Sequence, residues 1–200
     1  EAAAMATVEQ MLATASAAGA HLLVLPELFL PGYNVDDIAG RAQTIDGTWI
    51  KNLRRMARKA GCGLVIGYAE RDGATIYNSA VAFDEQGQEI SHYRKVQLFG
   101  PREKAIYAPG DAVSTFDLHG VPTSMLICYD VEFAPLVHKL AEAGAALVLV
   151  PTANPEPNTH VSRLVVPTHA INHSLTIAYA NYCGTEGDIT YCCASVIAAP

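Results

Sequence analysis

The stretch LVIGYAERDGATIYNSAVAFDEQGQEISHYRKV, residues 64–96, decides the class of fold. It contains three runs rich in the apolar and β-branched residues that are typical of strands, at residues 64–69, 75–83 and 89–96. The turn-forming clusters RDG and DEQGQ separate these runs, and such short connections favour hairpins between antiparallel neighbours. The stretch therefore predicts a three-stranded meander.

Helical and strand-like runs alternate on both sides of this meander. Helices are predicted at residues 2–18, 49–60, 132–143 and 161–174, and further strands at residues 21–25, 113–118, 123–128, 145–150, 175–182 and 191–198. Pro167 should kink the last helix or delay its start. A mixed sheet with helices outside indicates a layered α/β fold. Because no repeat or linker interrupts the pattern, we expect one domain over residues 1–200.

Composition limits the possible partners of this chain. Half of its 200 residues are hydrophobic and 16% are charged, which is enough for one domain with a substantial core. A formal net charge of −7 without Lys/Arg clusters argues against nucleic acid and anionic membranes. No apolar stretch reaches the roughly 20 residues that span a bilayer. Five cysteines without CxxC spacing fit a reducing compartment. We therefore expect a cytoplasmic protein that acts on a small molecule.

Both ends of the sequence look interrupted. Residue 1 is Glu rather than Met, and the first helical run has no capping residue before it. The last residues, CCASVIAAP, end just after an apolar strand-like run. The sequence therefore predicts a partial domain, cut at both ends.

Three reactive side chains stand at the ends of apolar, strand-like runs. Glu27 closes HLLVLPE, Lys95 closes EISHYRK and Cys128 closes VPTSMLIC. Taken singly, each has a simpler explanation: a structural acceptor, a solvated cation and a small buried hydrophobe. Together, however, a carboxylate, an ammonium and a thiol suffice for covalent acyl chemistry without a cofactor. Ligand crevices of α/β sheets lie where strands end, which favours one shared site.

Local sequence indicates how two of these side chains are oriented. The period of two along a strand places Tyr93 and Lys95 on one face, and His92 and Arg94 on the other. Cys128 lies between a buried strand and a predicted helix, so its thiol should project from a strand-to-helix turn. There the helix dipole would favour the thiolate, and free backbone N–H groups could bind an oxyanion.

The segments around these residues resemble a known family. LPELFLPGY, YRKVQLFG and ICYDVEF resemble, in order and spacing, the three signature segments of the nitrilase superfamily of carbon–nitrogen hydrolases. The resemblance covers nearly the whole chain. It implies an α-β-β-α sandwich that usually forms homodimers or higher homo-oligomers, with sheets stacked into an eight-layer body. It also implies that a first strand and the final segments lie outside residues 1–200.

The resemblance implies a role for each reactive residue. Cys128 would be the nucleophile, Glu27 the general base, and Lys95 the cation that stabilises the tetrahedral oxyanion together with the backbone N–H of Tyr129. A thioester on Cys128 would then be hydrolysed, without metal or organic cofactor. Glu103, in the loop GPREKAIYAPGD, matches the second glutamate of the family, which holds the lysine and positions substrate. An exposed Glu in a charged turn is the alternative.

The same resemblance indicates a pocket and a substrate class. The loops that line the family's cleft carry Tyr33, Phe99, Tyr129, Phe133, Ala153 and Asn154. Aromatic residues near strand ends are just as often part of a core. Tyr-Asp after the nucleophile resembles the amidase-like branch, whereas nitrile-cleaving members more often have Trp-Glu, so hydrolysis of a linear amide is expected. Nitrile hydrolysis with the same triad, a catalytically silent interaction subunit and acyl transfer remain alternatives.

Several positions depart from the family pattern. Residues 134–135 are Ala-Pro where relatives usually have Pro-Glu, and His169, Asn172 and His173 replace Arg, Glu and Asn. Cys193 stands where the family commonly has Gly. His169 and His173 are spaced i, i+4 on a predicted helix and could hold a metal, although a pair without a third ligand is more typical of a solvated or hydrogen-bonded face. These changes leave the triad intact.

Overall fold

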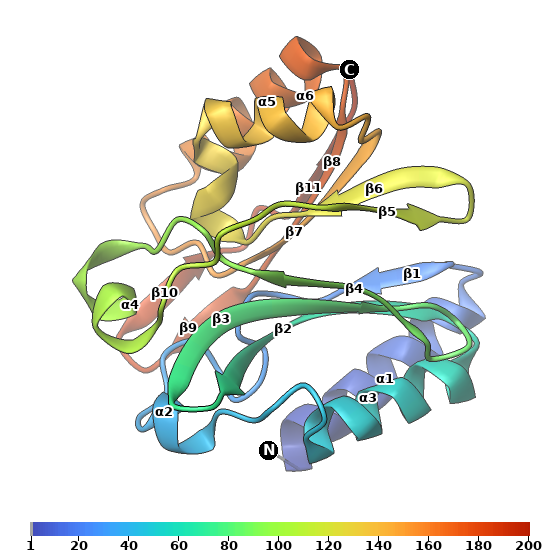
Figure 1. Ribbon diagram of the computed structural model, residues 1–200, viewed down its shortest axis with the longest axis vertical. Coiled ribbons are helices and arrows are strands. Elements are labelled where there is room, and N and C mark those ends of the chain that lie inside the picture. Colours follow the sequence, from blue (N-terminus) through green and yellow to red (C-terminus); the bar gives the residue numbers. More distant parts are fainter. Residues whose placement is uncertain (1) are drawn as a thin grey trace.

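In the computed structural model, which describes residues 2–200, two β-sheets stack face to face and each carries helices on its outer side (Figure 1). The first sheet has the strand order β1-β2-β3-β4, and the second has the order β11-β8-β7-β6-β5. A separate two-stranded hairpin is formed by β9 and β10. The α-β-β-α sandwich predicted from the sequence is confirmed.

The first sheet contains the predicted meander. Its strands are β1 (Leu22–Val24), β2 (Gly63–Asp72), β3 (Thr75–Phe83) and β4 (Glu89–Arg94). β2, β3 and β4 are consecutive antiparallel neighbours, as RDG and DEQGQ predicted, whereas β1 lies parallel to β2. Gly87 in the second turn has φ 72°, and an added Cβ would collide with the backbone oxygen of Arg54. Only glycine fits this turn against the neighbouring helix.

Helices α1 (Ala2–Ala17) and α3 (Thr48–Ala60) cover the outer face of the first sheet (Figure 1). α3 is amphipathic: Trp49, Ile50, Leu53 and Ala57 are buried, and they pack in one apolar cluster with β2 and β3. α3 ends at residue 60, as predicted, because Gly61 adopts the left-handed conformation with φ 61°. The short helix α2 (Ile38–Arg41) was not anticipated from the sequence.

The second sheet has a parallel centre and antiparallel edges. Its strands are β5 (Thr115–Leu118), β6 (Val121–Met125), β7 (Leu147–Thr152), β8 (Thr176–Asn181) and β11 (Val196–Ala198). β6, β7 and β8 are parallel, while β5 and β11 pair antiparallel at the edges. Helices α5 (Ala134–Glu142) and α6 (Val166–His173) cover its outer face. One continuous apolar cluster joins both sheets with these helices.

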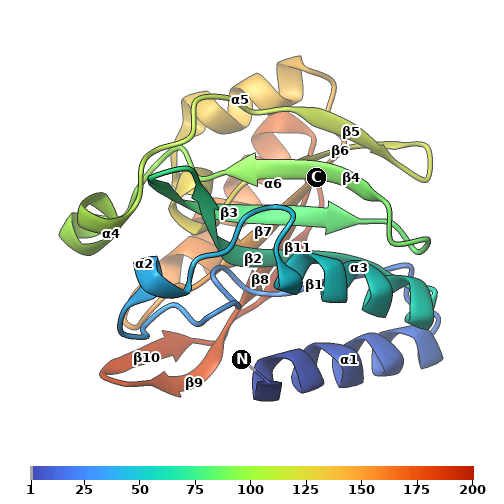
Figure 2. The ribbon, with the colours of Figure 1, turned by 60° about the horizontal axis from the view of Figure 1, so that its bottom comes forward.

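The prediction of one continuous strand over residues 191–198 is wrong, because this segment contains parts of two strands. β10 (Ile189–Cys192) pairs with β9 (Cys183–Glu186), and β11 belongs to the second sheet. Between them Cys193 and Ala194 have φ values of 59° and 41°, which interrupt extended backbone. Figure 2 shows that the β9–β10 hairpin projects at the same end of the sandwich as α4 (Gly100–Ile106).

Three predicted helical or loop segments differ from the structure. The segment GPREKAI is the helix α4 rather than a loop, with Pro101 in its first turn, where a missing N–H costs no hydrogen bond. The helix predicted at residues 161–174 begins as a π-helical turn, η2 (Val161–Val165), and becomes α6 where Pro167 lies in the first turn. A 3₁₀ helix, η1 (Cys128–Glu132), precedes α5. No helix within residues 2–200 has the length and apolar character needed to cross a membrane.

Candidate active site

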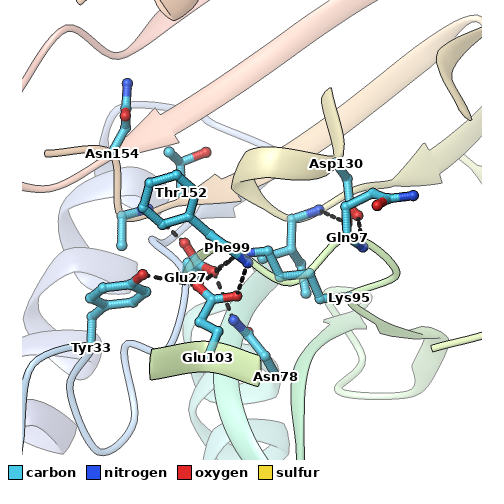
Figure 3. Close-up of polar contacts among 12 residues, drawn as sticks. Glu27, Tyr33, Asn78, Lys95, Gln97, Phe99, Glu103, Asp130, Thr152 and Asn154 are labelled. Carbon is cyan, nitrogen blue, oxygen red and sulfur yellow. Dashed lines mark hydrogen bonds and ion pairs between the residues drawn. The ribbon is translucent and has the colours of Figure 1, made fainter. Parts of the chain in front are cut away.

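Lys95 lies between two carboxylates at the end of the first sheet. Its Nζ donates to Glu27 Oε1 at 2.6 Å and to Glu103 Oε1 at 2.9 Å (Figure 3). Lys95 and Glu27 are completely buried, and Glu103 is 3% exposed. Burial by itself lowers the pKa of Lys95, but the charges of Glu27 and Glu103 outweigh it and raise that pKa above its usual value. The ammonium therefore keeps its proton.

Glu27 is held by three donors from three parts of the chain. Oε1 accepts from Lys95 and from Asn78 Nδ2 at 2.7 Å, and Oε2 accepts from the backbone N–H of Ala153 at 2.9 Å. Asn78 comes from β3 in the first sheet, whereas Ala153 follows β7 in the second. The carboxylate thus bridges the two sheets in a single orientation.

The backbone brings Glu27 close to the neighbouring strand. Leu28, the next residue, has φ 47°, which turns the chain sharply after the carboxylate. Gly67 of β2 faces this turn, and an added Cβ would collide with the backbone of Glu27 and Leu28. Left-handed backbone at a non-glycine residue carries a small strain that surrounding structure must hold in place. Glycine at position 67 makes this close packing possible.

Glu103 comes from α4, the helix that the sequence did not predict. Its Oε1 accepts from Lys95 and from the Tyr33 hydroxyl at 2.9 Å, and its Oε2 accepts from the backbone N–H of Phe99 at 2.9 Å (Figure 3). Burial raises the pKa of Glu103, the Lys95 charge opposes this effect and the Glu27 charge adds to it. Glu103 is therefore a buried partner of Lys95 rather than an exposed residue of a charged turn.

Cys128 begins η1, three residues past the end of β6. Its φ is 46°, another left-handed backbone at a non-glycine residue, and the residue is half-buried. Asp130 holds this turn because its carboxylate accepts from the backbone N–H of Ile127 at 3.0 Å, that of Gln97 at 2.7 Å and the Tyr93 hydroxyl at 2.9 Å. Asp130 is completely buried and ties the turn around Cys128 to the segment after Lys95.

The electrostatics of Cys128 differ from the sequence expectation. Burial raises the pKa of the thiol well above its usual value, and the charge of Glu27 raises it further. The Lys95 charge and a hydrogen bond from the Ala153 backbone oppose this effect but do not reverse it. The thiolate favoured by a helix dipole was therefore a wrong prediction, because the turn is a short 3₁₀ helix beside a carboxylate. The resting thiol is neutral and needs a base.

Cys128 opens into a pocket with about 380 Å³ of empty space, part of it open to solvent. The pocket is lined by Phe99, Cys128, Tyr129, Glu132, Ala153, Asn154, Pro155, Asn158, His160 and Val161. Four of the six residues that the sequence suggested for the pocket are therefore among its lining residues. Of the other two, Tyr33 bonds to Glu103, and Phe133 packs edge-to-face on Tyr129 with ring centroids 4.9 Å apart.

Sequence reasoning missed most of the residues that hold this site together. Asn78 reads as an ordinary strand residue, and Asp130 was noted only as part of a family segment. Asn181 of β8 was also missed: its Oδ1 accepts from the backbone N–H of Asn154 at 2.8 Å, and its Nδ2 donates back to the Asn154 carbonyl at 3.1 Å. A polar residue within an otherwise apolar strand is the one signal that could have indicated Asn78 and Asn181.

None of the residues that depart from the family pattern is among the residues that line the pocket. His169 and His173 lie on α6, in the outer helical layer, with ring centroids 5.5 Å apart. Burial lowers the pKa of His169, and the charge of His173 lowers it further. Within residues 2–200, no group of three or more His, Cys, Asp or Glu residues is placed to hold a metal ion.

Comparison with known proteins decides the family. The family model described as carbon-nitrogen hydrolase matches residues 1–200. The chain belongs to the carbon–nitrogen hydrolase family. The family expected from the three sequence segments is therefore confirmed.

Several carbon–nitrogen hydrolases are similar to this chain. "Hydrolase in pqqF 5'region" of Pseudomonas protegens is 42% identical over 189 residues, which are 92% of this chain and 66% of that protein. An (R)-stereoselective amidase of Pseudomonas sp. is 33% identical over 168 residues, which are 84% of this chain and 61% of the amidase. The chain thus spans less than two thirds of the length of these two relatives.

A solved structure shares the fold of this carbon–nitrogen hydrolase. It is a Glu-to-Gln mutant of the amidase from Nesterenkonia sp. AN1, with the acetamide moiety of fluoroacetamide added covalently at the active-site cysteine. The TM-score is 0.90 at 37% sequence identity, covering 96% of this chain and 74% of that one. The similarity therefore extends over nearly all of the chain described here.

Proposed function

We propose that this protein is a thiol amidase, which hydrolyses a small linear amide to a carboxylic acid and ammonia through a thioester on Cys128. One observation carries the proposal: the buried carboxylate of Glu27 bonds to Lys95 and to the backbone of Ala153, and Ala153 lines the same small pocket as the Cys128 thiol. A related amidase that reacts covalently at its active-site cysteine supports the same chemistry. No step requires a metal or organic cofactor.

The first step forms the tetrahedral intermediate. Because the Cys128 thiol is neutral at rest, Glu27 takes its proton as the sulfur attacks the amide carbon. The C=O electron pair moves to oxygen, which becomes the oxyanion. Glu27 suits this role because Ala153, Lys95 and Asn78 hold both of its oxygens in place. A base held in one orientation needs no rearrangement when the proton moves.

The oxyanion is stabilised by donors that the protein does not use for itself. Lys95 spends two of its three N–H donors on Glu27 and Glu103, so the third is free for the substrate oxygen. Within the described residues, the backbone N–H of Tyr129 donates to no protein group and follows directly on Cys128. Donors fixed in a buried site stabilise developing charge more strongly than water does.

The intermediate then breaks down in two stages. The C–N bond cleaves with proton transfer from Glu27 to nitrogen, so ammonia leaves and a thioester remains on Cys128. Water next attacks the thioester carbon while Glu27 accepts its proton; the carboxylic acid leaves and the sulfur regains a proton. Glu103 positions Lys95, and Asp130 positions the turn of Cys128, each through hydrogen bonds described above. Neither needs to exchange a proton with substrate.

Three further expectations belong to this proposal. Residues 1–200 form part of one carbon–nitrogen hydrolase domain, since one family model matches all of them. The protein works in the cytoplasm, which is supported by five free thiols and no disulfide among the described residues. It forms a homodimer or higher homo-oligomer, which light scattering of the whole protein would test.

Ammonia release tests the function. The whole protein is incubated with a panel of short aliphatic and aromatic amides, beside Cys128→Ala and the control Cys183→Ala, whose exposed thiol lies on β9. We expect release from the wild type and from Cys183→Ala, and a loss of at least about 10⁴-fold for Cys128→Ala. Equal release from wild type and Cys128→Ala would contradict the mechanism.

The alternatives give different results in the same assay. A nitrilase would convert the matching nitriles faster than the amides. A catalytically silent subunit would release ammonia from neither class, and mass spectrometry would find no acyl adduct on Cys128 after incubation with substrate. Either outcome would replace the amidase proposal.

A further inference from the structure

Glu132 differs from every other buried or half-buried carboxylate around the site. It lies at the end of η1, four residues after Cys128, and lines the same pocket. Within residues 2–200, no hydrogen bond or ion pair reaches its carboxylate, and only burial and more distant charges affect it. A half-buried carboxylate without a protein partner keeps its oxygens free to accept hydrogen bonds from a ligand in the pocket.

The other carboxylates around the site differ from Glu132 in having protein donors. Glu27 accepts three hydrogen bonds from Lys95, Asn78 and Ala153. Glu103 and Asp130 also accept three each. The fold therefore supplies donors to Glu27, Glu103 and Asp130, whereas Glu132 lines the pocket without a protein partner among the described residues.

The surrounding charges indicate which ligand Glu132 would prefer. Burial raises the pKa of Glu132, while the charges of His160 and Lys95 lower it. Lys95 is already engaged by Glu27 and Glu103, and exposed His160 forms no ion pair with Glu132. A ligand ammonium beside Glu132 would stabilise the negative carboxylate, which burial disfavours. A ligand carboxylate would instead meet a like charge, which costs binding energy.

We infer that Glu132 determines substrate specificity by binding a protonated amine at the far end of the amide substrate. The inference rests on the proposed amidase function, because it places the scissile amide at Cys128 and the amine at Glu132. The part of the substrate between the amide and the amine would lie in the same pocket, where Phe99, Tyr129 and Val161 offer apolar surface. The substrate class is thus a short amide with a terminal amino group.

The positions of the two residues favour a short substrate. Cys128 and Glu132 lie on the same short helix, η1, and both line one small pocket. A substrate that reaches both residues therefore has only a short stem between its amide and its amino group.

Three amides that differ only in their terminal group test the inference: 5-aminopentanamide, pentanamide and 4-carbamoylbutanoate. We expect kcat/KM of the wild type to be at least about 10-fold higher for the amino-amide than for pentanamide, since one charge-assisted contact contributes about 1.5–3 kcal/mol. Glu132→Gln should lower this ratio to near one. Glu132→Lys should shift the preference towards 4-carbamoylbutanoate, a reversal that a merely structural role of Glu132 would not produce.

A control variant and a binding measurement distinguish failure of the Glu132 inference from failure of the amidase proposal. Glu142→Gln, on the exposed side of α5, removes a carboxylate without touching the pocket and should keep the wild-type ratio. In Cys128→Ala, calorimetry should show tighter binding of 5-aminopentanamide than of pentanamide, and this difference should vanish when Glu132→Gln is added. If no amide is hydrolysed but the binding preference persists, the amidase proposal fails and the role of Glu132 stands. If amides are hydrolysed with equal ratios in wild type and Glu132→Gln, the inference about Glu132 is overturned.

Discussion

Two ion clusters are built from adjacent residues of the same strands, but they differ in their relation to the pocket of Cys128: Glu27 and Glu103 bond to Ala153 and Phe99, which line that pocket. On β3, Asn78 donates to Glu27 while Ser79 donates to Glu70 at 2.6 Å. Next in the sheet, Arg94 at the end of β4 binds Glu70, and Lys95, which follows it, binds Glu27. The alternation of strand side chains therefore directs one set to the interface between the sheets and the other set away from it.

The Glu70 cluster is the more strongly paired of the two. Arg94 binds Glu70 through two nitrogens, at 2.5 and 3.0 Å, and His92 Nε2 lies 3.1 Å from the same carboxylate. Arg94 also binds Asp72 at 2.9 Å and stacks over the ring of Tyr77 at 3.9 Å. Yet within residues 2–200 none of the hydrogen-bond partners of Glu70 lines the pocket of Cys128. A buried ion pair is therefore no sign of catalysis by itself.

The Glu27 cluster differs from the Glu70 cluster in two features: a reactive thiol nearby and an unused hydrogen-bond donor. Lys95 has an unused N–H, and Glu27 acts on a thiol that opens into a pocket. In the Glu70 cluster the cation is partly exposed and its best donors are engaged in fixed pairs. The comparison predicts that equivalent substitutions in the two clusters have different consequences for activity.

The largest difference is expected for the two glutamates. Glu27→Gln removes the proposed base, so we expect amide hydrolysis to fall by about 10²–10⁴-fold, the usual contribution of a positioned proton-transfer group. Glu70→Gln should leave turnover within a few-fold of wild type. Steady-state ammonia release from both variants measures the contrast. Comparable losses in two folded variants would show that the Glu70 cluster also supports the chemistry.

Substitution of the two cations, Lys95 and Arg94, should distinguish an effect on activity from an effect on stability alone. Lys95→Met leaves Glu27 and Glu103 buried without their cation, which should cost about 3–5 kcal/mol of unfolding free energy and abolish turnover. Arg94→Met leaves Glu70 with donors from His92 and Ser79, so we expect a cost of about 1–3 kcal/mol.

Urea unfolding followed by circular dichroism, together with ammonia release, measures both effects. An Arg94→Met protein that stays folded but loses all activity would contradict the assignment of Arg94 to a structural cluster.

The Glu70 cluster should also leave a signature in the pH dependence of stability. Burial by itself raises the pKa of Glu70, but hydrogen bonds from His92, Arg94 and Ser79 outweigh it and lower that pKa from 4.5 to about 2. Since the folded protein holds this carboxylate ionised more firmly than the unfolded chain does, its contribution is complete above about pH 5. It is lost as the pH falls from 4.5 towards 2.

A comparison of wild type with Glu70→Gln isolates this contribution. We expect the difference in unfolding free energy, of the order of 2–3 kcal/mol at neutral pH, to shrink between pH 5 and pH 2. Urea unfolding at a series of pH values measures it. A difference that stays constant down to pH 2 would mean that Glu70 is not held ionised in the fold.

The separation of these two clusters could be predicted in part from the sequence. The period of two placed Tyr93 and Lys95 on one face, and the structure has them bonded to Asp130 and Glu27. Periodicity alone could not give their partners, because Glu27 lies 68 residues before Lys95 and the pairing depends on how the chain folds; the shared site was expected only from the strand ends and the family resemblance. Local periodicity indicates a face, whereas the partner on that face is set by tertiary packing.

Backbone contributions to the site carry no sequence signal at all. The N–H of Ala153 holds Glu27, although alanine offers no polar side chain that would attract attention. The raised pKa of Cys128 likewise depends on burial beside Glu27, which overrides the local helix terminus. By contrast, α4 could have been found, because Pro101 and the charged residues after it match the start of a helix.

The smallest effect is expected from two tyrosines, one in each cluster. The Tyr33 hydroxyl donates to Glu103 at 2.9 Å, and the Tyr68 hydroxyl lies 3.2 Å from His92 Nε2. Removing either hydroxyl as Phe deletes one hydrogen bond, so each variant should lose about 1 kcal/mol of unfolding free energy.

Only Tyr33→Phe should change kcat/KM, by less than about 10-fold, because Glu103 would keep its bonds to Lys95 and Phe99 but hold them less rigidly. If both variants lose the same stability and only Tyr33→Phe changes kcat/KM, both clusters stabilise the fold and only the Glu27 cluster supports catalysis. An equal fall in kcat/KM for Tyr68→Phe would instead mean that His92 and Glu70 are coupled to the site through β4, and the division between the clusters would have to be abandoned.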